Sequence, residues 1–152
     1  MEACRAAVEN KPEDPRFRYQ YARAMQTIEP ASAAHIYEQL VAERYPAAFD
    51  NYGWVLIQLQ NDYAGAERLF RAGIALDNAD ARQSLAELII KNRIRPRYKR
   101  EAVDLMREAA EQGNADARTY LAEYDERKRQ ENEAKAVVKG IFGSILRGAT
   151  GR

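Results

Sequence analysis

Residues 79 to 88 read ADARQSLAEL, and residues 115 to 124 read ADARTYLAEY. The two segments are identical at seven of ten positions and lie 36 residues apart. A repeat at a period of this size is typical of repeat proteins, whose units stack because no single unit can bury its apolar face alone. Such proteins present extended binding surfaces. We therefore expect the sequence to reveal an architecture and a binding face.

Three further segments carry apolar residues at positions i, i+3, i+4, i+7 and i+8, which places these residues on one face of a helix. The three stripes are Ala33, Ile36, Tyr37, Leu40 and Val41; Ala66, Leu69, Phe70, Gly73 and Ile74; and Ala102, Leu105, Met106, Ala109 and Ala110. A second helix is expected after each stripe, with small residues in related positions at Gly53, Ala86 and Ala122, where helices approach closely. The repeating unit is therefore predicted to be a helical hairpin.

Turn-forming residues separate the periodic segments. They are Pro12, Pro15, Pro30, Pro46, Asp77, Asn78, Pro96, Gly113 and Asn114. Connections this short make neighbouring helices antiparallel. No segment alternates apolar and polar residues over the length of a strand, so no sheet is expected. The predicted fold class is all-α.

Residues 102 to 124, AVDLMREAAEQGNADARTYLAEY, resemble the Sel-one-like repeat, a relative of the tetratricopeptide repeat. Residues 66 to 88 fit that pattern more loosely, and residues 15 to 53 fit only the tetratricopeptide spacing. The resemblance implies a right-handed α-α solenoid of about three to four helical hairpins over residues 1 to 124. The chain departs from the family between Lys91 and Arg100, where the usual glycines are missing.

Composition and motifs argue against catalysis. With 46% hydrophobic and 31% charged residues the chain is globular, and its formal net charge of +1 creates no global field for nucleic acid or membrane. Cys4 and His35 are each the only residue of their type, which excludes an internal disulfide and a histidine cluster for a metal. Ser144 lacks the second glycine of a nucleophile elbow, and no phosphate-binding glycine loop occurs. We predict no enzymatic activity, no cofactor and no metal site.

In the tetratricopeptide frame, which counts the helix after each stripe as the first of the next hairpin, a binding face is predicted on the first helix of each hairpin. Its candidate partner-binding residues are Tyr19, Arg23, Asp50, Trp54, Gln58, Gln83 and Glu87. Trp54 is the only tryptophan, and a tryptophan in a groove is a natural anchor for a peptide. The resulting hypothesis is that Trp54, Tyr19 and Arg23 form the centre of a peptide-binding groove. The alternative, which we favour for Trp54 itself, is that it is buried between hairpins with its indole N–H on a backbone carbonyl.

A basic segment, NRIRPRYKRE, covers residues 92 to 101. Its cations are Arg93, Arg95, Arg97, Lys99 and Arg100, with Tyr98 between them. Five cations within eight positions form an anion patch that could contact phosphates. The alternative, which we favour, is a solvated turn paired with Glu87 or Glu101. Nucleic acid is therefore an unfavoured partner.

The chain changes character after residue 124. Residues 125 to 135 lack an apolar stripe and are expected to continue the last helix in solvent, with ion pairs at i, i+4. An amphipathic stripe follows at Ala134, Val137, Val138, Ile141, Phe142, Ile145 and Leu146. The favoured interpretation is a capping helix folded back on the last hairpin. The alternatives are a homodimer through this helix and a helix at a membrane interface.

The sequence thus predicts a repeat domain over residues 1 to 124 and an extension with an amphipathic helix over residues 125 to 152. The predicted function is protein or peptide binding by a scaffold or adaptor. The runner-up is an oligomerisation or membrane-interface module, and a weaker alternative is a polyanion binder. Because no signal peptide or spanning segment is evident, we expect a cytoplasmic protein. Cys4, Ala7 and Val8 match the stripe of a second helix, so the chain is expected to begin within a repeat, as a module of a longer protein would.

Overall fold

A computed structural model of the chain describes residue 6 and residues 9 to 149, with side chains described as far as Phe142. Its helices are α2 (Pro15–Met25), α3 (Pro30–Ala42), α4 (Pro46–Gln60), α5 (Tyr63–Ile74), α6 (Ala79–Ile90), α7 (Glu101–Glu111) and α8 (Ala115–Ala149). No strand occurs within these residues, so the prediction of an all-α fold is confirmed for them.

The helices begin and end where the turn-forming residues lie. Helices α2, α3 and α4 each have proline in the first turn, where its missing N–H costs nothing. Asn78 and Asn114 accept backbone N–H groups at the starts of α6 and α8, at 3.1 and 2.9 Å. Helices α3 to α7 are each followed by one residue with positive φ, and these residues are Arg44, Asn61, Asp77, Asn92 and Gly113.

Asn92 explains how α6 can end without the glycines that the Sel-one-like pattern has between Lys91 and Arg100. Its φ of 53° is left-handed, as is that of Gly113 one unit later. Asparagine tolerates this conformation better than other residues with a Cβ atom. The backbone N–H of Arg93 then donates to the carbonyl of Leu88 at 2.8 Å, which closes the end of α6. The helix therefore ends in the ordinary way without glycine.

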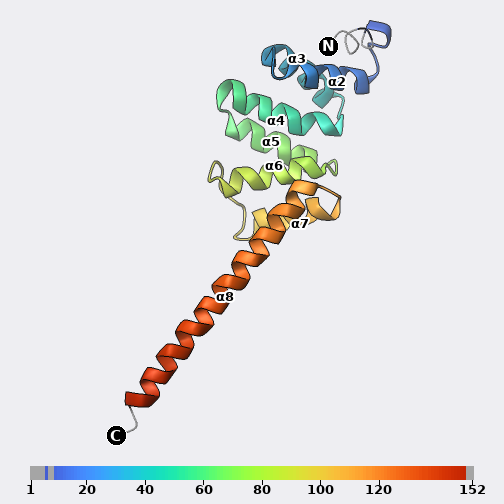
Figure 1. The fold of residues 1–152 in the computed structure, drawn as a ribbon. Coiled ribbons are helices and arrows are strands. Elements are labelled where there is room, and N and C mark those ends of the chain that lie inside the picture. Colours follow the sequence, from blue (N-terminus) through green and yellow to red (C-terminus); the bar gives the residue numbers. More distant parts are fainter. Residues whose placement is uncertain (1–5, 7–8, 150–152) are drawn as a thin grey trace.

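The helices pack in chain order. Each helix from α2 to α8 packs against the next, and α2 with α4 and α4 with α6 make further contacts (Figure 1). Sequential packing of neighbouring helices fits a helical repeat, because each pair covers the apolar face of the pair beside it. Helices α2, α4 and α6 therefore lie beside one another.

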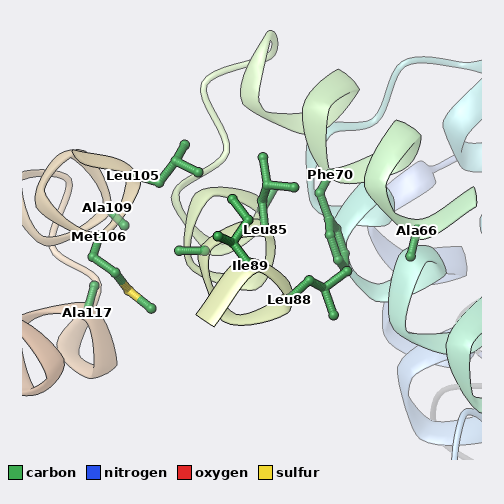
Figure 2. Close-up of a cluster of buried hydrophobic side chains, with 11 residues drawn as sticks. Ala66, Phe70, Leu85, Leu88, Ile89, Leu105, Met106, Ala109 and Ala117 are labelled. Atoms are coloured by element: carbon green, nitrogen blue, oxygen red, sulfur yellow. The ribbon is translucent and has the colours of Figure 1, made fainter. Parts of the chain in front are cut away.

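Two apolar clusters form the core. One joins α2, α3 and α4 around Met25, Tyr37 and Leu40. The other runs from α5 to the start of α8 around Phe70 and Met106 (Figure 2). The predicted stripes supply much of both clusters, with Ala33, Tyr37, Leu40, Ala66, Phe70, Leu105, Met106 and Ala109 buried. The helical periodicity therefore identified the core correctly.

Small residues allow the close approach of α4 and α5. A Cβ atom on Gly53 would lie 2.3 Å from Cε1 of Phe70, so this position of α4 admits no side chain while Phe70 keeps its place. Phe70 itself is fully buried. The prediction that Gly53 serves close packing is confirmed.

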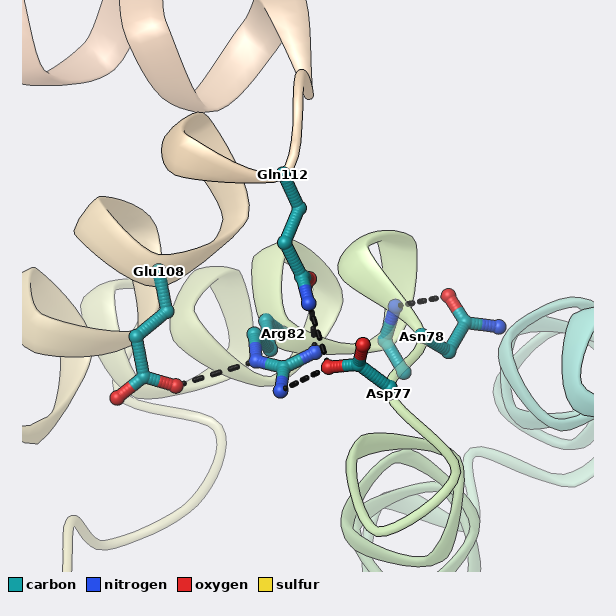
Figure 3. A network of polar contacts seen from close by, with 6 residues as sticks. Asp77, Asn78, Arg82, Glu108 and Gln112 are labelled. Atoms are coloured by element: carbon teal, nitrogen blue, oxygen red, sulfur yellow. Dashed lines mark hydrogen bonds and ion pairs between the residues drawn. The ribbon is translucent and has the colours of Figure 1, made fainter.

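A polar network on the surface joins α6 and α7 (Figure 3). Arg82 of α6 donates to Glu108 of α7 at 3.1 Å, to Gln112 at 2.8 Å and to Asp77 before α6 at 2.9 Å. Three acceptors around one planar guanidinium fix its orientation. The network therefore sets the register of α7 against the preceding hairpin.

The prediction that the C-terminal amphipathic helix caps the last hairpin is wrong for the described residues. Helix α8 packs against α7 near its start and then extends away from the other helices (Figure 1). Val137, Val138, Ile141 and Phe142 are 61, 51, 55 and 63% exposed. No proline or glycine occurs from Ala115 to Lys139, so nothing in that stretch turns the chain back. The side chains of Ile145 and Leu146 lie outside the described residues.

Candidate functional site

Helices α2, α4 and α6 present side chains to one another across their shared side. We call this surface, carrying Tyr19, Arg23, Asp50, Trp54, Gln83 and Glu87, the α2–α4–α6 face. The amide of Asn51 on α4 donates to the Tyr19 hydroxyl on α2 at 2.9 Å. The Trp54 indole on α4 donates to the Ser84 hydroxyl on α6 at 2.8 Å. These two hydrogen bonds join α4 to α2 and α4 to α6.

Trp54 is half-buried and packs against the core cluster. Its ring packs on Phe70 with centroids 5.7 Å apart, and Lys91 Nζ lies 6.0 Å from its centroid. The predicted bond from its N–H to a backbone carbonyl is wrong, because the acceptor is Ser84 Oγ. Ser84 is buried and was not among the predicted site residues. Nothing in the sequence marks it, because the pairing depends on how α4 and α6 are rotated against each other.

Asp50 lies beside Trp54 in an unfavourable environment for a carboxylate. Burial raises the pKa of Asp50 to about 6, although a hydrogen bond from Ser84 opposes the rise and the charges of Asp80 and Glu87 add to it. Its buried Oδ1 atom has no hydrogen-bond partner within the described part of the chain. Trp54 therefore lies one helical turn from a carboxyl group whose pKa is raised to about 6.

Gln83 and Glu87 form a polar ladder along α6. Gln83 donates to Glu87 at 2.8 Å, and Glu87 accepts from Lys91 at 2.7 Å. Asn114, at the start of α8, donates to Gln83 at 2.9 Å. Gln83 and Glu87 are therefore close to Trp54, and part of their hydrogen-bonding capacity is used in the bond between them. Gln58, the remaining candidate on α4, is exposed.

Tyr19 and Arg23 lie at the α2 end of the face. Tyr19 packs on Tyr37 and Tyr45, with centroids 6.2 and 5.4 Å apart, and burial raises the pKa of its hydroxyl. The Arg23 guanidinium lies 5.8 Å from the Tyr19 centroid and is exposed. The structure therefore joins Tyr19 to Arg23, and connects Tyr19 to α4 through Asn51, the neighbour of Asp50.

The basic segment lies between α6 and α7 and is largely exposed, with an open pocket lined by residues 92 to 96. The sequence suggested that cations of this segment pair with Glu87 or Glu101. Glu87 instead accepts a hydrogen bond from Lys91, and Glu101 accepts one from the backbone N–H of Arg97. Arg93 lies over the Tyr63 ring, 5.4 Å from its centroid, and Arg100 approaches Asp104 at 4.0 Å. Arg93 and Arg95 are among the residues that line this pocket, and Arg97, Lys99 and Arg100 are not.

Glu101 anchors the end of this segment. It is 3% exposed at the first residue of α7 and accepts from Arg71 Nη1 at 2.7 Å. Burial acts to raise its pKa, but the hydrogen bonds and charges of Arg71 and Arg97 outweigh burial and hold the pKa below its ordinary value. The role of Glu101 is therefore to fix the segment on α5 and α7.

The described residues contain no group of three or more His, Cys, Asp and Glu side chains placed to hold a metal ion. Within the same part of the chain, no helix combines the length and apolarity needed to cross a bilayer. In comparisons with known proteins, no family model and no curated protein matches the chain. The resemblance to the Sel-one-like repeat therefore stays a prediction.

Proposed function

We propose that this protein is a non-enzymatic scaffold or adaptor, a right-handed α-α solenoid that binds a peptide or protein domain on its α2–α4–α6 face. The observation that carries the proposal is Trp54, a half-buried aromatic ring that donates to Ser84 and packs on Phe70. A large aromatic ring that is already immobilised loses little conformational entropy when it contacts a partner. Such residues contribute strongly to binding at interfaces.

The surroundings of Trp54 support a partner with mixed chemistry. The ring offers apolar area, and Asp50, Glu87 and Lys91 around it offer hydrogen-bond acceptors and donors. An anchor surrounded by polar groups that exclude water is the usual anatomy of a binding hot spot. The best-fitting ligand is therefore a peptide with an apolar side chain next to polar or charged residues.

The test begins with a displayed peptide library selected on the full chain. Because the chain has a single tryptophan, the fluorescence of Trp54 reports directly on peptides that bind beside it. Selected peptides are titrated against the wild type, Trp54→Ala and Gln58→Ala. We expect the dissociation constant to rise about tenfold or more for Trp54→Ala, measured by calorimetry, because a buried anchor is lost.

Two controls keep the test specific. Tyr98→Ala removes an exposed aromatic residue from the basic segment and should leave the affinity unchanged. Trp54→Phe retains a ring for packing on Phe70 and separates loss of the anchor from loss of the fold, which circular dichroism checks. Peptides that bind Trp54→Ala as tightly as the wild type, without changing Trp54 fluorescence, would refute the proposed face.

A further inference from the structure

The last part of α8 has a different surface from the part that precedes it. We call residues 134 to 149 the distal α8 segment. Val137, Val138, Ile141 and Phe142 lie on one side of this helix, because they are spaced by one, three and four residues. All four are more than half exposed, and the helix carries them away from the rest of the molecule (Figure 1).

The charges change at the same point. In the preceding part of α8, Arg127, Lys128 and Arg129 are paired with Glu123, Glu131 and Glu126, respectively. The distal α8 segment contains Lys135, Lys139 and Arg147 and no acidic residue. Lys135 and Lys139 form no ion pair within the part of the chain whose side chains are described. Lys135 helps to lower the pKa of Glu131, one turn before it, and the distal α8 segment itself has a net positive charge along the apolar stripe.

The cations lie beside the apolar stripe. Lys135, Lys139 and Phe142 are spaced at i, i+4 and i+7, so they follow one another along the same side of the helix. A row of ammonium groups bordering exposed apolar side chains suits a surface that is apolar inside and negatively charged outside. An anionic lipid bilayer has this arrangement, with acyl chains beneath phosphate headgroups.

We infer that the distal α8 segment binds the surface of an anionic lipid bilayer, with the apolar stripe at the level of the upper acyl chains and Lys135 and Lys139 among the phosphates. This mode needs an amphipathic helix lying in the interface and no spanning segment. It agrees with the absence, among the described residues, of a helix able to span a bilayer. The inference goes beyond the proposed function, since it concerns a different surface.

A second copy of the chain fits this surface less well. Helices that pair along an apolar seam usually place opposite charges beside it. Two distal α8 segments supply six cations and no acidic side chain, so pairing them brings like charges together. Phosphate headgroups supply the missing negative charge.

The experiment is co-sedimentation of the full chain with vesicles. One set contains phosphatidylcholine alone, and the other contains about 30% phosphatidylglycerol. We expect binding to the anionic vesicles at least about tenfold tighter than to the neutral ones, and weaker binding as NaCl rises from about 50 to about 500 mM, because salt screens the headgroup charge.

Two double variants separate the two contributions. Ile141→Ser with Phe142→Ser, and Lys135→Glu with Lys139→Glu, should each lower the affinity for anionic vesicles at least about tenfold. The matched control, Leu59→Ser with Ile90→Ser, removes exposed apolar side chains from α4 and α6 and should leave vesicle binding unchanged. Trp54 fluorescence and circular dichroism verify that each variant is folded.

Three outcomes would overturn the inference. If the apolar double variant still binds vesicles, the binding depends on charge alone, as binding to any polyanion such as a nucleic acid would. Equal binding to both vesicle sets would remove the role of the headgroups. A dimer in light scattering that the apolar variant dissociates, without vesicle binding by the wild type, would assign the stripe to a second copy.

Discussion

At the scale of single residues, Asp50 is unusual because it is held where a negative charge is costly. Its pKa is raised to about 6 by burial, against an ordinary value of 3.8. The native state therefore retains a proton that the unfolded state releases at lower pH. The stability of the native state should fall as the pH rises from about 4 to about 6, and the cost remains at neutral pH.

Asp50→Asn is therefore expected to stabilise the protein at pH 7, by at most about 3 kcal/mol, since each unit of pKa shift corresponds to about 1.4 kcal/mol. The amide can still pair with the Ser84 hydroxyl. Urea denaturation at pH 4.5 and pH 7 measures the effect, which should fall to about 1 kcal/mol at the lower pH because the unfolded carboxyl is already largely ionised there. Asp125→Asn, at an exposed position of α8, is the control. A loss of stability in Asp50→Asn at pH 7 would contradict the assignment.

Residues of this kind also mark the limit of sequence reasoning. Trp54 stands out because it is the only tryptophan, and Asp50 could be placed one turn before it on the same face. Ser84 and Asn51 could not be found, because their roles depend on hydrogen bonds between α4 and helices α6 and α2. Such bonds depend on helix rotation, which periodicity does not define to the accuracy of a hydrogen bond.

At the scale of helices, the contact between α4 and α5 depends on Gly53. Alanine normally favours a helix over glycine by about 1 kcal/mol. At Gly53 the added methyl group would meet Phe70, and overpacking of this kind costs about 1 to 3 kcal/mol. We expect Gly53→Ala to lower the melting temperature despite its better helix propensity.

Gly140→Ala provides the matched comparison. A Cβ atom there would meet nothing within 4 Å, so only helix propensity should act. The helix signal in circular dichroism should rise slightly, with the melting temperature of the core unchanged. If the two substitutions affect the melting temperature alike, close packing at Gly53 is not the reason for that glycine.

The helices themselves were largely predictable. The three stripes correspond to α3, α5 and α7, and the second helices of the hairpins correspond to α4, α6 and α8. The direction of the distal α8 segment was not predictable, because an amphipathic stripe shows that a helix has an apolar side without showing what covers it. The lack of proline and glycine from Ala115 to Lys139 was the feature of the sequence that could have indicated a helix without a turn.

At the scale of the whole molecule, the core ends near the start of α8. Ala117 is its last fully buried apolar residue in the described part of the chain, and residues 127 to 142 are exposed. Removal of residues 132 to 152 should therefore leave the free energy of unfolding unchanged within about 0.5 kcal/mol, as for changes at exposed sites.

Chemical denaturation of the shortened and complete chains measures this difference, and the slope with denaturant should also be nearly equal. A loss of several kcal/mol would mean that the end of the chain covers the repeats in solution, in conflict with the extended position of α8. The same shortened chain should retain any peptide binding at Trp54.

Because α8 is continuous, a change in its length also changes the side of the molecule to which its far end faces. Each residue advances a helix by about 1.5 Å and turns it by about 100°, so the helix is roughly 50 Å long and its far end has a defined phase relative to the repeats. Inserting or deleting seven residues near Gln130 would shift the distance with little rotation. A change of two residues would aim the terminal stripe at the opposite side. The length of α8 therefore determines both how far its apolar stripe lies from the other helices and which way that stripe faces.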